Sequence, residues 1–279
     1  MGLRNSDSES IQDLTIVVGD ESSVVRVYEN GPQTGETLIV LHGWGSSSDL
    51  MAPLTRRLSA KWHTVAIDMP GHGSSPAPPS AWSVRDHVHI VSEVVRMLEI
   101  EAFALVGHSN GGRISIELAS NQSIKLKPSF LILISPSGIP RNRTAAYYVR
   151  LWTAKVLKWP FYLFPGVIKE FGLDWLRNSL IWKFLGSSDY RALTGVMKDT
   201  FVRTVNHYVV DQLPSVKCPV VVFWGSNDDA ITRRQMEILV QKLPDAGLFV
   251  LENAGHFGYL DQPDPIVSTI QAMLDGGAK

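Results

Sequence analysis

The sequence has little cysteine, almost no net charge and no long apolar run. Its 279 residues include one cysteine, Cys218, so an internal disulfide framework is excluded. The formal net charge of −1 gives no overall attraction to nucleic acid, and no nucleic-acid partner is expected. Nowhere do about 18 apolar residues follow one another, and residues 1–10 are polar, without the apolar stretch of a secretion signal. We therefore expect no transmembrane segment and a cytoplasmic location.

What the chain does contain is a regular alternation of short apolar runs and helical patterns. With 44% hydrophobic and 19% charged residues, it is globular and long enough for one α/β domain with an insertion. The predicted strands are 14–18, 24–28, 37–41, 63–67, 103–106, 130–134, 219–224 and 248–251, and the predicted helices are 48–59, 83–98, 112–120, 233–243 and 265–274. Strand and helix alternate from 37 to 134, which favours a parallel sheet with helices on both faces.

The alternation stops in the middle of the chain. Between 137 and 210 no clear strand is found, and the segment holds four of the eight tryptophans and eleven Lys or Arg residues against four acidic ones. An insertion at the carboxyl end of a parallel strand lies where active sites form. We predict a core domain of residues 1–136 and 211–279 and a helical cap, or lid, of residues 137–210.

The pentapeptide Gly107-His108-Ser109-Asn110-Gly111 lies between an apolar run and a helical stretch. A Gly-x-Ser-x-Gly sequence in that setting is typical of a nucleophile elbow, a sharp strand-to-helix turn that exposes a strained serine. The pattern alone arises by chance in roughly one chain in ten at ordinary Gly and Ser frequencies. Its context makes Ser109 the candidate nucleophile.

A serine nucleophile needs a base, and the base needs an acid that orients it. Of eight histidines, His256 follows the last predicted strand near the C-terminus, where active-site loops gather, and is the candidate base. The acid is expected after strand 219–224, where Asp228 and Asp229 are adjacent. Because neighbouring side chains point different ways, the residue pattern leaves the choice between them open.

Attack on a carbonyl creates an oxyanion that needs preorganised donors. The backbone N–H of Asn110, directly after the nucleophile, is one candidate. The Trp44 N–H is the other, because the glycines of His42-Gly43-Trp44-Gly45 allow a main-chain turn after strand 37–41. No cluster of His and carboxylate residues has the spacing of metal ligands, and no metal is expected.

Five motifs in this order resemble the α/β-hydrolase superfamily over residues 14–275. They are His42-Gly43-Trp44-Gly45, Asp68-x-Pro70-Gly71-His72-Gly73-Ser74-Ser75, Gly107-His108-Ser109-Asn110-Gly111-Gly112, Gly225-x-x-Asp228 and Gly255-His256-Phe257. The resemblance implies an eight-stranded, mostly parallel sheet, a helical cap after strand six and no cofactor. It also places the acid three residues after a glycine, which selects Asp228. The His-Gly-Trp-Gly loop is similar to that of carboxylesterases.

These features predict a serine hydrolase that cleaves a carboxylic ester, lactone or thioester of a small to medium apolar acyl substrate through an acyl-enzyme on Ser109. A hydrolase of carbon–carbon bonds in ring-fission diketones and a hydrolase-like ligand receptor are the alternatives. The substrate pocket is expected to include His42, Trp152, Trp159 and Trp182. The excess positive charge of the cap makes an anionic carrier or surface a further candidate partner.

Overall fold

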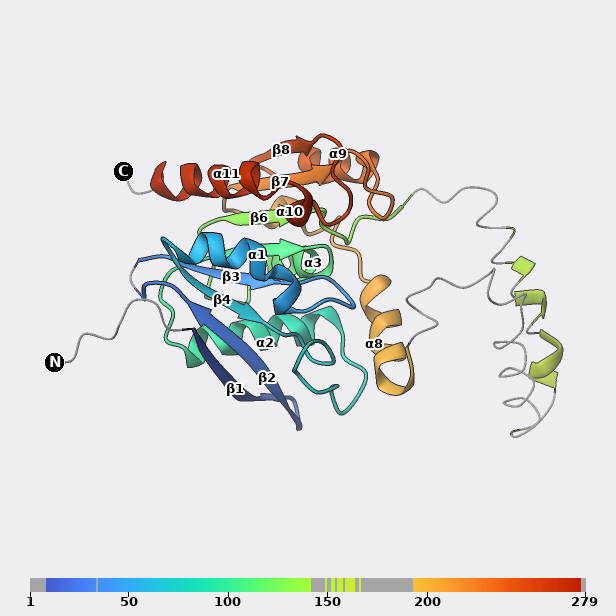
Figure 1. Cartoon of the computed structure of the whole chain (residues 1–279). Helices are drawn as coiled ribbons and strands as arrows, with labels where there is room; N and C mark the ends of the chain where they lie inside the picture. Colours follow the sequence, from blue (N-terminus) through green and yellow to red (C-terminus); the bar gives the residue numbers. More distant parts are fainter. Residues whose placement is uncertain are drawn as a thin grey trace.

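The fold is built on one eight-stranded sheet. A computed structural model of the protein describes residues 9–33, 35–141 and 193–276, together with 149, 152–153, 155–157, 159–163 and 166. The strands are β1 (Ser10–Val18), β2 (Glu21–Asn30), β3 (Thr37–Leu41), β4 (His63–Ile67), β5 (Phe103–His108), β6 (Leu131–Ile134), β7 (Val220–Gly225) and β8 (Ala246–Leu251). They lie side by side in the order β1-β2-β4-β3-β5-β6-β7-β8 (Figure 1).

Most strands of this sheet run parallel. The strand β2 is antiparallel to both of its neighbours, β1 and β4, and every other pairing is parallel. In the centre, Gly107 of β5 lies opposite Leu41 of β3 and Leu133 of β6. The carboxyl ends of these strands therefore meet at one edge of the sheet, and the predicted eight-stranded, mostly parallel sheet is confirmed.

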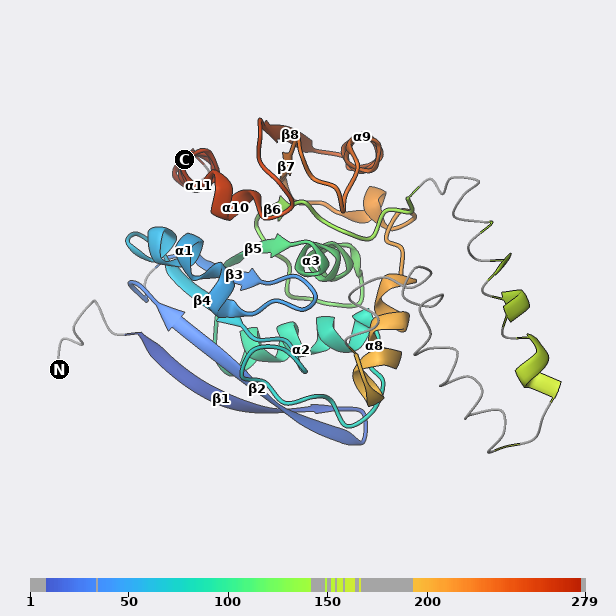
Figure 2. The ribbon, with the colours of Figure 1, turned by 45° about the vertical axis from the view of Figure 1, so that its right-hand side comes forward.

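Helices cover both faces of the sheet, as predicted (Figure 2). One face packs against α2 (Val84–Met97), α3 (Asn110–Ser120) and α9 (Arg233–Lys242). The other face packs against α1 (Ser48–Ser59), α10 (Gly258–Asp261) and α11 (Pro263–Gly276). The chain thus forms three layers, in which the sheet is the middle one.

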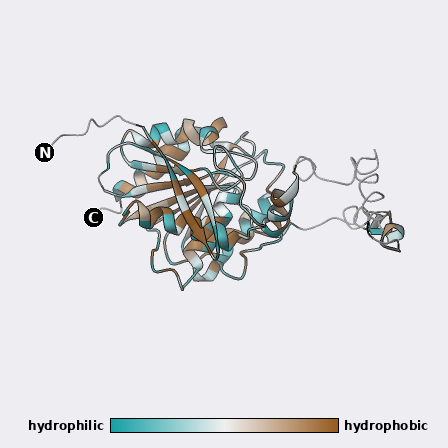
Figure 3. Cartoon of the chain, turned by 90° about the horizontal axis from the view of Figure 1, so that it is seen from below, coloured by the Kyte–Doolittle hydropathy of each residue, from teal (hydrophilic) through white to brown (hydrophobic). Residues whose placement is uncertain are grey.

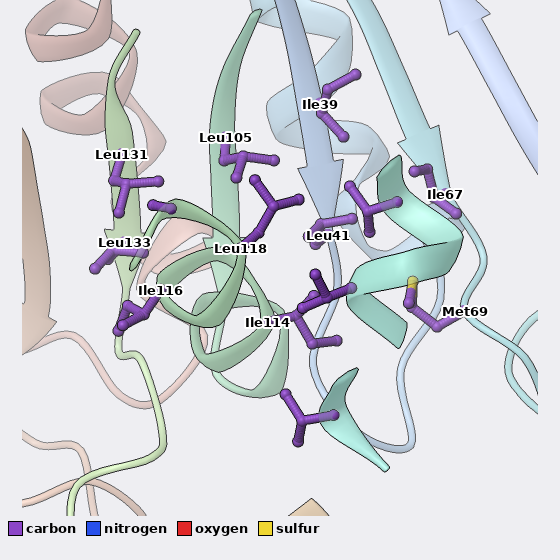
Figure 4. Packing of buried hydrophobic residues seen from close by; sticks show 14 of the residues in the cluster. Ile39, Leu41, Ile67, Met69, Leu105, Ile114, Ile116, Leu118, Leu131 and Leu133 are labelled. Carbon is purple, nitrogen blue, oxygen red and sulfur yellow. The ribbon is translucent and has the colours of Figure 1, made fainter. Parts of the chain in front are cut away.

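The core has two sides because successive side chains of each strand point to opposite faces of the sheet. Ile39 and Leu41 of β3 point to the α2 and α3 side, where Figure 4 shows them near Ile114 and Leu118 of α3. Leu38 of the same strand packs on the opposite side. All five of these side chains are 1% exposed or less, and each contributes about 1.5–3 kcal/mol through burial. The hydropathy colouring agrees, because the central strands are largely brown (Figure 3).

The first two strands are longer than the sequence indicated. The strand β1 begins at Ser10 rather than at 14, and β2 covers Glu21–Asn30 rather than 24–28. One face of β1 packs on the core through Leu14 and Ile16, and residues of the other face, such as Asp13 and Thr15, stay exposed. These polar residues interrupt the apolar run without ending the strand.

The chain between β6 and β7 contains α8 (Gly195–Val205) and the short 3-10 helices Trp159–Leu163 and Leu213–Ser215. Most of residues 142–192 lie outside the described residues, so the predicted cap and the boundaries at 136 and 211 stay predictions. In the part of the chain that the structure describes, no helix has the length and apolar character required to cross a bilayer.

Candidate active site

Ser109 occupies a strained turn between β5 and α3. The strand ends at His108, the helix begins at Asn110, and Ser109 between them has φ +50° and ψ −109°. A non-glycine residue with positive φ is held there only by its surroundings, and such residues concentrate at functional sites. The Ser109 N–H donates to the Ile134 carbonyl at 3.0 Å, which ties the turn to the end of β6.

The glycines of the pentapeptide are required by close backbone contacts. A Cβ atom on Gly107 would lie 2.7 Å from the Gly111 backbone, and one on Gly111 would lie 2.2 Å from the Leu41 carbonyl oxygen. Side chains at these positions would push α3 away from the sheet. The structure therefore shows the strand-turn-helix context that the pentapeptide predicts for a nucleophile elbow.

Asp228 and His256 are directly paired. The Nδ1 of His256 lies 2.9 Å from the Asp228 Oδ2, and the other carboxylate oxygen accepts the N–H groups of Ala230 at 2.9 Å and Ile231 at 2.8 Å. The Asp228 side chain is fully buried, whereas Asp229 is exposed. Burial opposes ionisation of Asp228, but the bonds from His256 and Ile231 outweigh it and hold its pKa below the ordinary value. The geometry thus favours Asp228 over Asp229.

The loop that carries His256 lies against the elbow. The ring centroid of His256 is 4.8 Å from that of His108, the residue before Ser109. The His108 Nε2–H donates to the His256 carbonyl at 3.0 Å. Since Nδ1 donates its proton to Asp228, Nε2 of His256 is the nitrogen able to accept one. The three predicted residues thus come from β5, β7 and β8 to the same edge of the sheet.

The predicted oxyanion loop is held by His42. The Nε2 of His42 accepts the Met69 N–H at 3.1 Å, so its proton is on Nδ1, which donates to the Gly43 carbonyl at 2.7 Å. In a trans peptide the N–H points opposite to the carbonyl, so the Trp44 N–H points away from His42. A Cβ atom on Gly43 would lie 3.2 Å from the Ser109 Cβ, which shows how closely this loop adjoins the elbow.

Both predicted oxyanion donors are free of backbone acceptors. Among the described residues, neither the Trp44 N–H nor the Asn110 N–H donates to a backbone carbonyl. The Asn110 N–H is also the first of α3, at the positive end of the helix dipole. Each N–H is therefore unused by the described backbone, as the prediction of an oxyanion donor requires.

The structure describes three of the four residues predicted to line the substrate pocket. His42 is 2% exposed and both its ring nitrogens are bonded, so only its ring is left for substrate contact. Trp152 and Trp159 are 68% and 65% exposed, and Trp182 lies outside the described residues. The pocket roles of all four stay predictions, as does an anionic partner for the cap.

Helix α8 supplies site neighbours that the sequence patterns missed. The Phe201 ring centroid lies 5.1 Å from the Trp44 ring, and the Met197 sulfur fills the place of a Cβ atom on Gly71. Figures 1 and 2 both show α8 beyond the carboxyl ends of β3 and β5. Its 11 residues carry apolar side chains at helical spacing, a signal that was hidden within the longer insertion.

Other reactive groups have ordinary structural environments. Cys218 precedes β7, and burial raises its pKa to about 11, so its thiol is poorly ionised at neutral pH. Among the described residues, no group of three His, Cys, Asp or Glu side chains is arranged to hold a metal ion.

A buried histidine of α2 is predicted to make folding sensitive to acid. Burial lowers the pKa of His87 from 6.5 to about 4. Below pH 6.5 the unfolded chain therefore binds a proton that the folded chain excludes until about pH 4, so stability falls as pH is lowered. We expect His87→Gln to reduce the slope of the unfolding free energy by about 1.4 kcal/mol per pH unit between pH 6 and 4.5. Urea unfolding across this range measures the slope.

The matched control is His89→Gln, which changes an exposed histidine two residues away on the same helix. It makes the same chemical change on a side chain that stays in solvent, so it controls for the substitution itself. An equal slope in wild type and His87→Gln would contradict the prediction, because it would mean that His87 takes up its proton at the same pH in the folded and the unfolded chain.

Comparisons with known proteins agree with the fold. Residues 38–269 match the family model described as the Alpha/beta hydrolase family. The chain is 25% identical over 264 residues to a pimeloyl-[acyl-carrier protein] methyl ester esterase of Aromatoleum aromaticum, with 86% of this chain and 98% of that protein covered. It is 24% identical to Lipase 1 of Psychrobacter immobilis, with 97% and 86% covered. An esterase structure from Exiguobacterium antarcticum matches with a TM-score of 0.70 at 19% identity, covering 95% of this chain and 100% of that one.

Proposed function

The chain belongs to the alpha/beta hydrolase family, and from this premise we propose that it is a serine hydrolase of carboxylic esters, lactones or thioesters with a small to medium apolar acyl group. The observation that supports the proposal most is the 2.9 Å bond between Asp228 and His256, beside a strained Ser109. The names of the two curated relatives, an esterase and a lipase, agree with ester hydrolysis.

In the proposed reaction, Ser109 Oγ attacks the substrate carbonyl carbon while His256 Nε2 takes the hydroxyl proton. Asp228 stabilises the imidazolium, and the N–H groups of Trp44 and Asn110 stabilise the oxyanion. Collapse of the tetrahedral intermediate breaks the bond to the leaving alcohol or thiol, which receives the proton from His256. Water then attacks the acyl-enzyme with His256 as its base, and this step releases the acid and restores Ser109.

A fluorophosphonate probe tests this proposal directly. We expect the probe to label the wild-type protein on the peptide that contains Ser109, as mapped by mass spectrometry, because phosphonylation needs an activated serine. A panel of p-nitrophenyl esters, lactones, acyl thioesters and ring-fission diketones then defines the reaction by initial rates. Labelling without turnover of any panel member would favour a ligand receptor. Turnover of diketones alone would favour carbon–carbon hydrolysis, and the absence of both labelling and turnover would refute the proposal.

A further inference from the structure

Helix α3 carries a buried arginine one turn beyond Ser109. Arg113 is 6% exposed, and its Nη1 donates to the Asn110 Oδ1 at 3.1 Å and to the Thr204 carbonyl at 2.6 Å. Its Nε is buried and has no hydrogen-bond partner in the described part of the chain. Among the described residues, no carboxylate lies within ion-pair distance of this guanidinium. Burial lowers the pKa of Arg113 to about 10, so the group is still a cation at neutral pH.

Arg113 lies where the inserted segment leaves and re-enters the core. After β6, the Ser137 N–H donates to the Ser109 carbonyl at 2.9 Å, and a Cβ atom on Gly138 would lie 3.3 Å from the Arg113 Cγ. On the return, the Val209 N–H donates to the Gly138 carbonyl at 3.0 Å. Both ends of the insertion therefore meet over the guanidinium.

The contact with Thr204 fixes the end of α8. Thr204 is in the last turn of that helix, where the helix dipole is negative, and its carbonyl also accepts the His207 N–H at 3.1 Å. A cation that binds such a carbonyl caps the helix. Arg113 thus joins α8, near the C-terminal end of the insertion, to the first residue of α3.

A direct contact between Arg113 and substrate does not fit this geometry, because the side chain is buried and its Nη1 already binds two acceptors. A buried cation without a carboxylate is unfavourable for folding. Its Asn110 partner carries the backbone N–H that adjoins Ser109, so any benefit of the cation to the reaction passes through Asn110.

We propose that Arg113 is a positioning residue for the oxyanion hole, where it holds Asn110 in the orientation that aims its backbone N–H at the oxyanion and ties that orientation to α8. This inference rests on the proposed serine hydrolase function. It also explains why a polar residue follows the nucleophile here, since the Asn110 amide oxygen is the acceptor that the guanidinium needs.

The test compares Arg113→Met with wild type on the p-nitrophenyl ester that is turned over best. We expect kcat to fall about 10- to 100-fold with KM changed less than about threefold, because the oxyanion exists only after attack. An alkyl trifluoromethyl ketone gives a second readout. Ser109 Oγ adds to its carbonyl carbon, the serine proton goes to His256, and the ketone oxygen becomes an oxyanion. Its inhibition constant should rise by about the same factor as kcat falls.

Three further variants make the result specific. Arg113→Lys keeps the cation and one donor and should recover part of the lost kcat. Asn110→Ala should lower kcat. The double variant with Arg113→Met should lose little more, because both substitutions break the same hydrogen bond between Arg113 and Asn110. Arg96→Met removes an exposed arginine that pairs with Glu93 on α2 and should leave kcat unchanged.

Two outcomes would overturn the inference. In the first, Arg113→Met lowers the melting temperature but leaves kcat and the ketone inhibition constant at wild-type values, which would make Arg113 an anchor of α8 only. In the second, the losses from Arg113→Met and Asn110→Ala multiply, which would show that they act separately. If Arg113→Met does not fold, Arg113→Lys and Asn110→Ala carry the same comparison. Fluorophosphonate labelling of the wild type keeps the two proposals apart, since a protein that is labelled normally retains the hydrolase function even when the Arg113 inference fails.

Discussion

Ser109→Ala is expected to lower ester turnover by about 10⁴-fold or more. The substitution removes the oxygen that attacks the substrate carbonyl in the proposed mechanism, and water held by the remaining groups is a poor replacement. It leaves the Asp228–His256 pair and the two predicted oxyanion donors in place. Initial rates with a p-nitrophenyl ester, together with loss of fluorophosphonate labelling, measure the effect.

The matched control is Ser92→Ala on α2, whose hydroxyl donates to the Val88 carbonyl at 3.0 Å within the same helix. Its activity should stay within about twofold of wild type, because surface changes away from the site have small effects. Wild-type activity in Ser109→Ala would show that another group performs the reaction.

Strain at Ser109 makes a second variant informative. Glycine adopts φ +50° without a steric cost, so Ser109→Gly should be inactive and yet more stable than wild type by about 1 kcal/mol. Chemical denaturation measures this gain. A loss of stability would mean that the Ser109 side chain itself holds the turn together.

Much of the fold could be predicted because buried parallel strands have a strong sequence signal. Runs such as Leu131–Ile134 are apolar on both faces, and a glycine or polar turn residue ends each strand. The strands β1 and β2 and the four-residue helix α10 (Gly258–Asp261) were harder to delimit. Half-exposed strands mix polar and apolar residues, and one helical turn has no periodicity to detect.

The site could be predicted where backbone geometry requires particular residues. Gly107 and Gly111 allow the tight elbow, and this requirement made Ser109 recognisable. Contacts between distant segments have no such signal. The contact between Phe201 and Trp44 depends on how α8 packs. Arg113 could have been noticed only as the one cation in the sequence of α3.

Asp228→Asn is expected to lower kcat by about 10⁴-fold at pH 7. In the wild type the carboxylate accepts the Nδ1 proton of His256 at 2.9 Å, which leaves Nε2 as the base. An asparagine amide can donate to Nδ1 and thereby place the imidazole proton on Nε2, where it prevents His256 from accepting the serine proton. Steady-state rates measure the loss. Thermal unfolding should show a folded protein, since the asparagine oxygen can still accept the N–H groups of Ala230 and Ile231.

The neighbouring aspartate provides the matched control. Asp229→Asn makes the same chemical change one position along the chain, on an exposed side chain, and should change kcat less than about twofold. The adjacent positions are indistinguishable by residue type, and only the turn after β7 separates a buried carboxylate bonded to His256 from one in solvent. The reverse result, with Asp228→Asn active and Asp229→Asn inactive, would require this turn to rearrange before catalysis, because the wild-type geometry gives Asp229 no route to the imidazole.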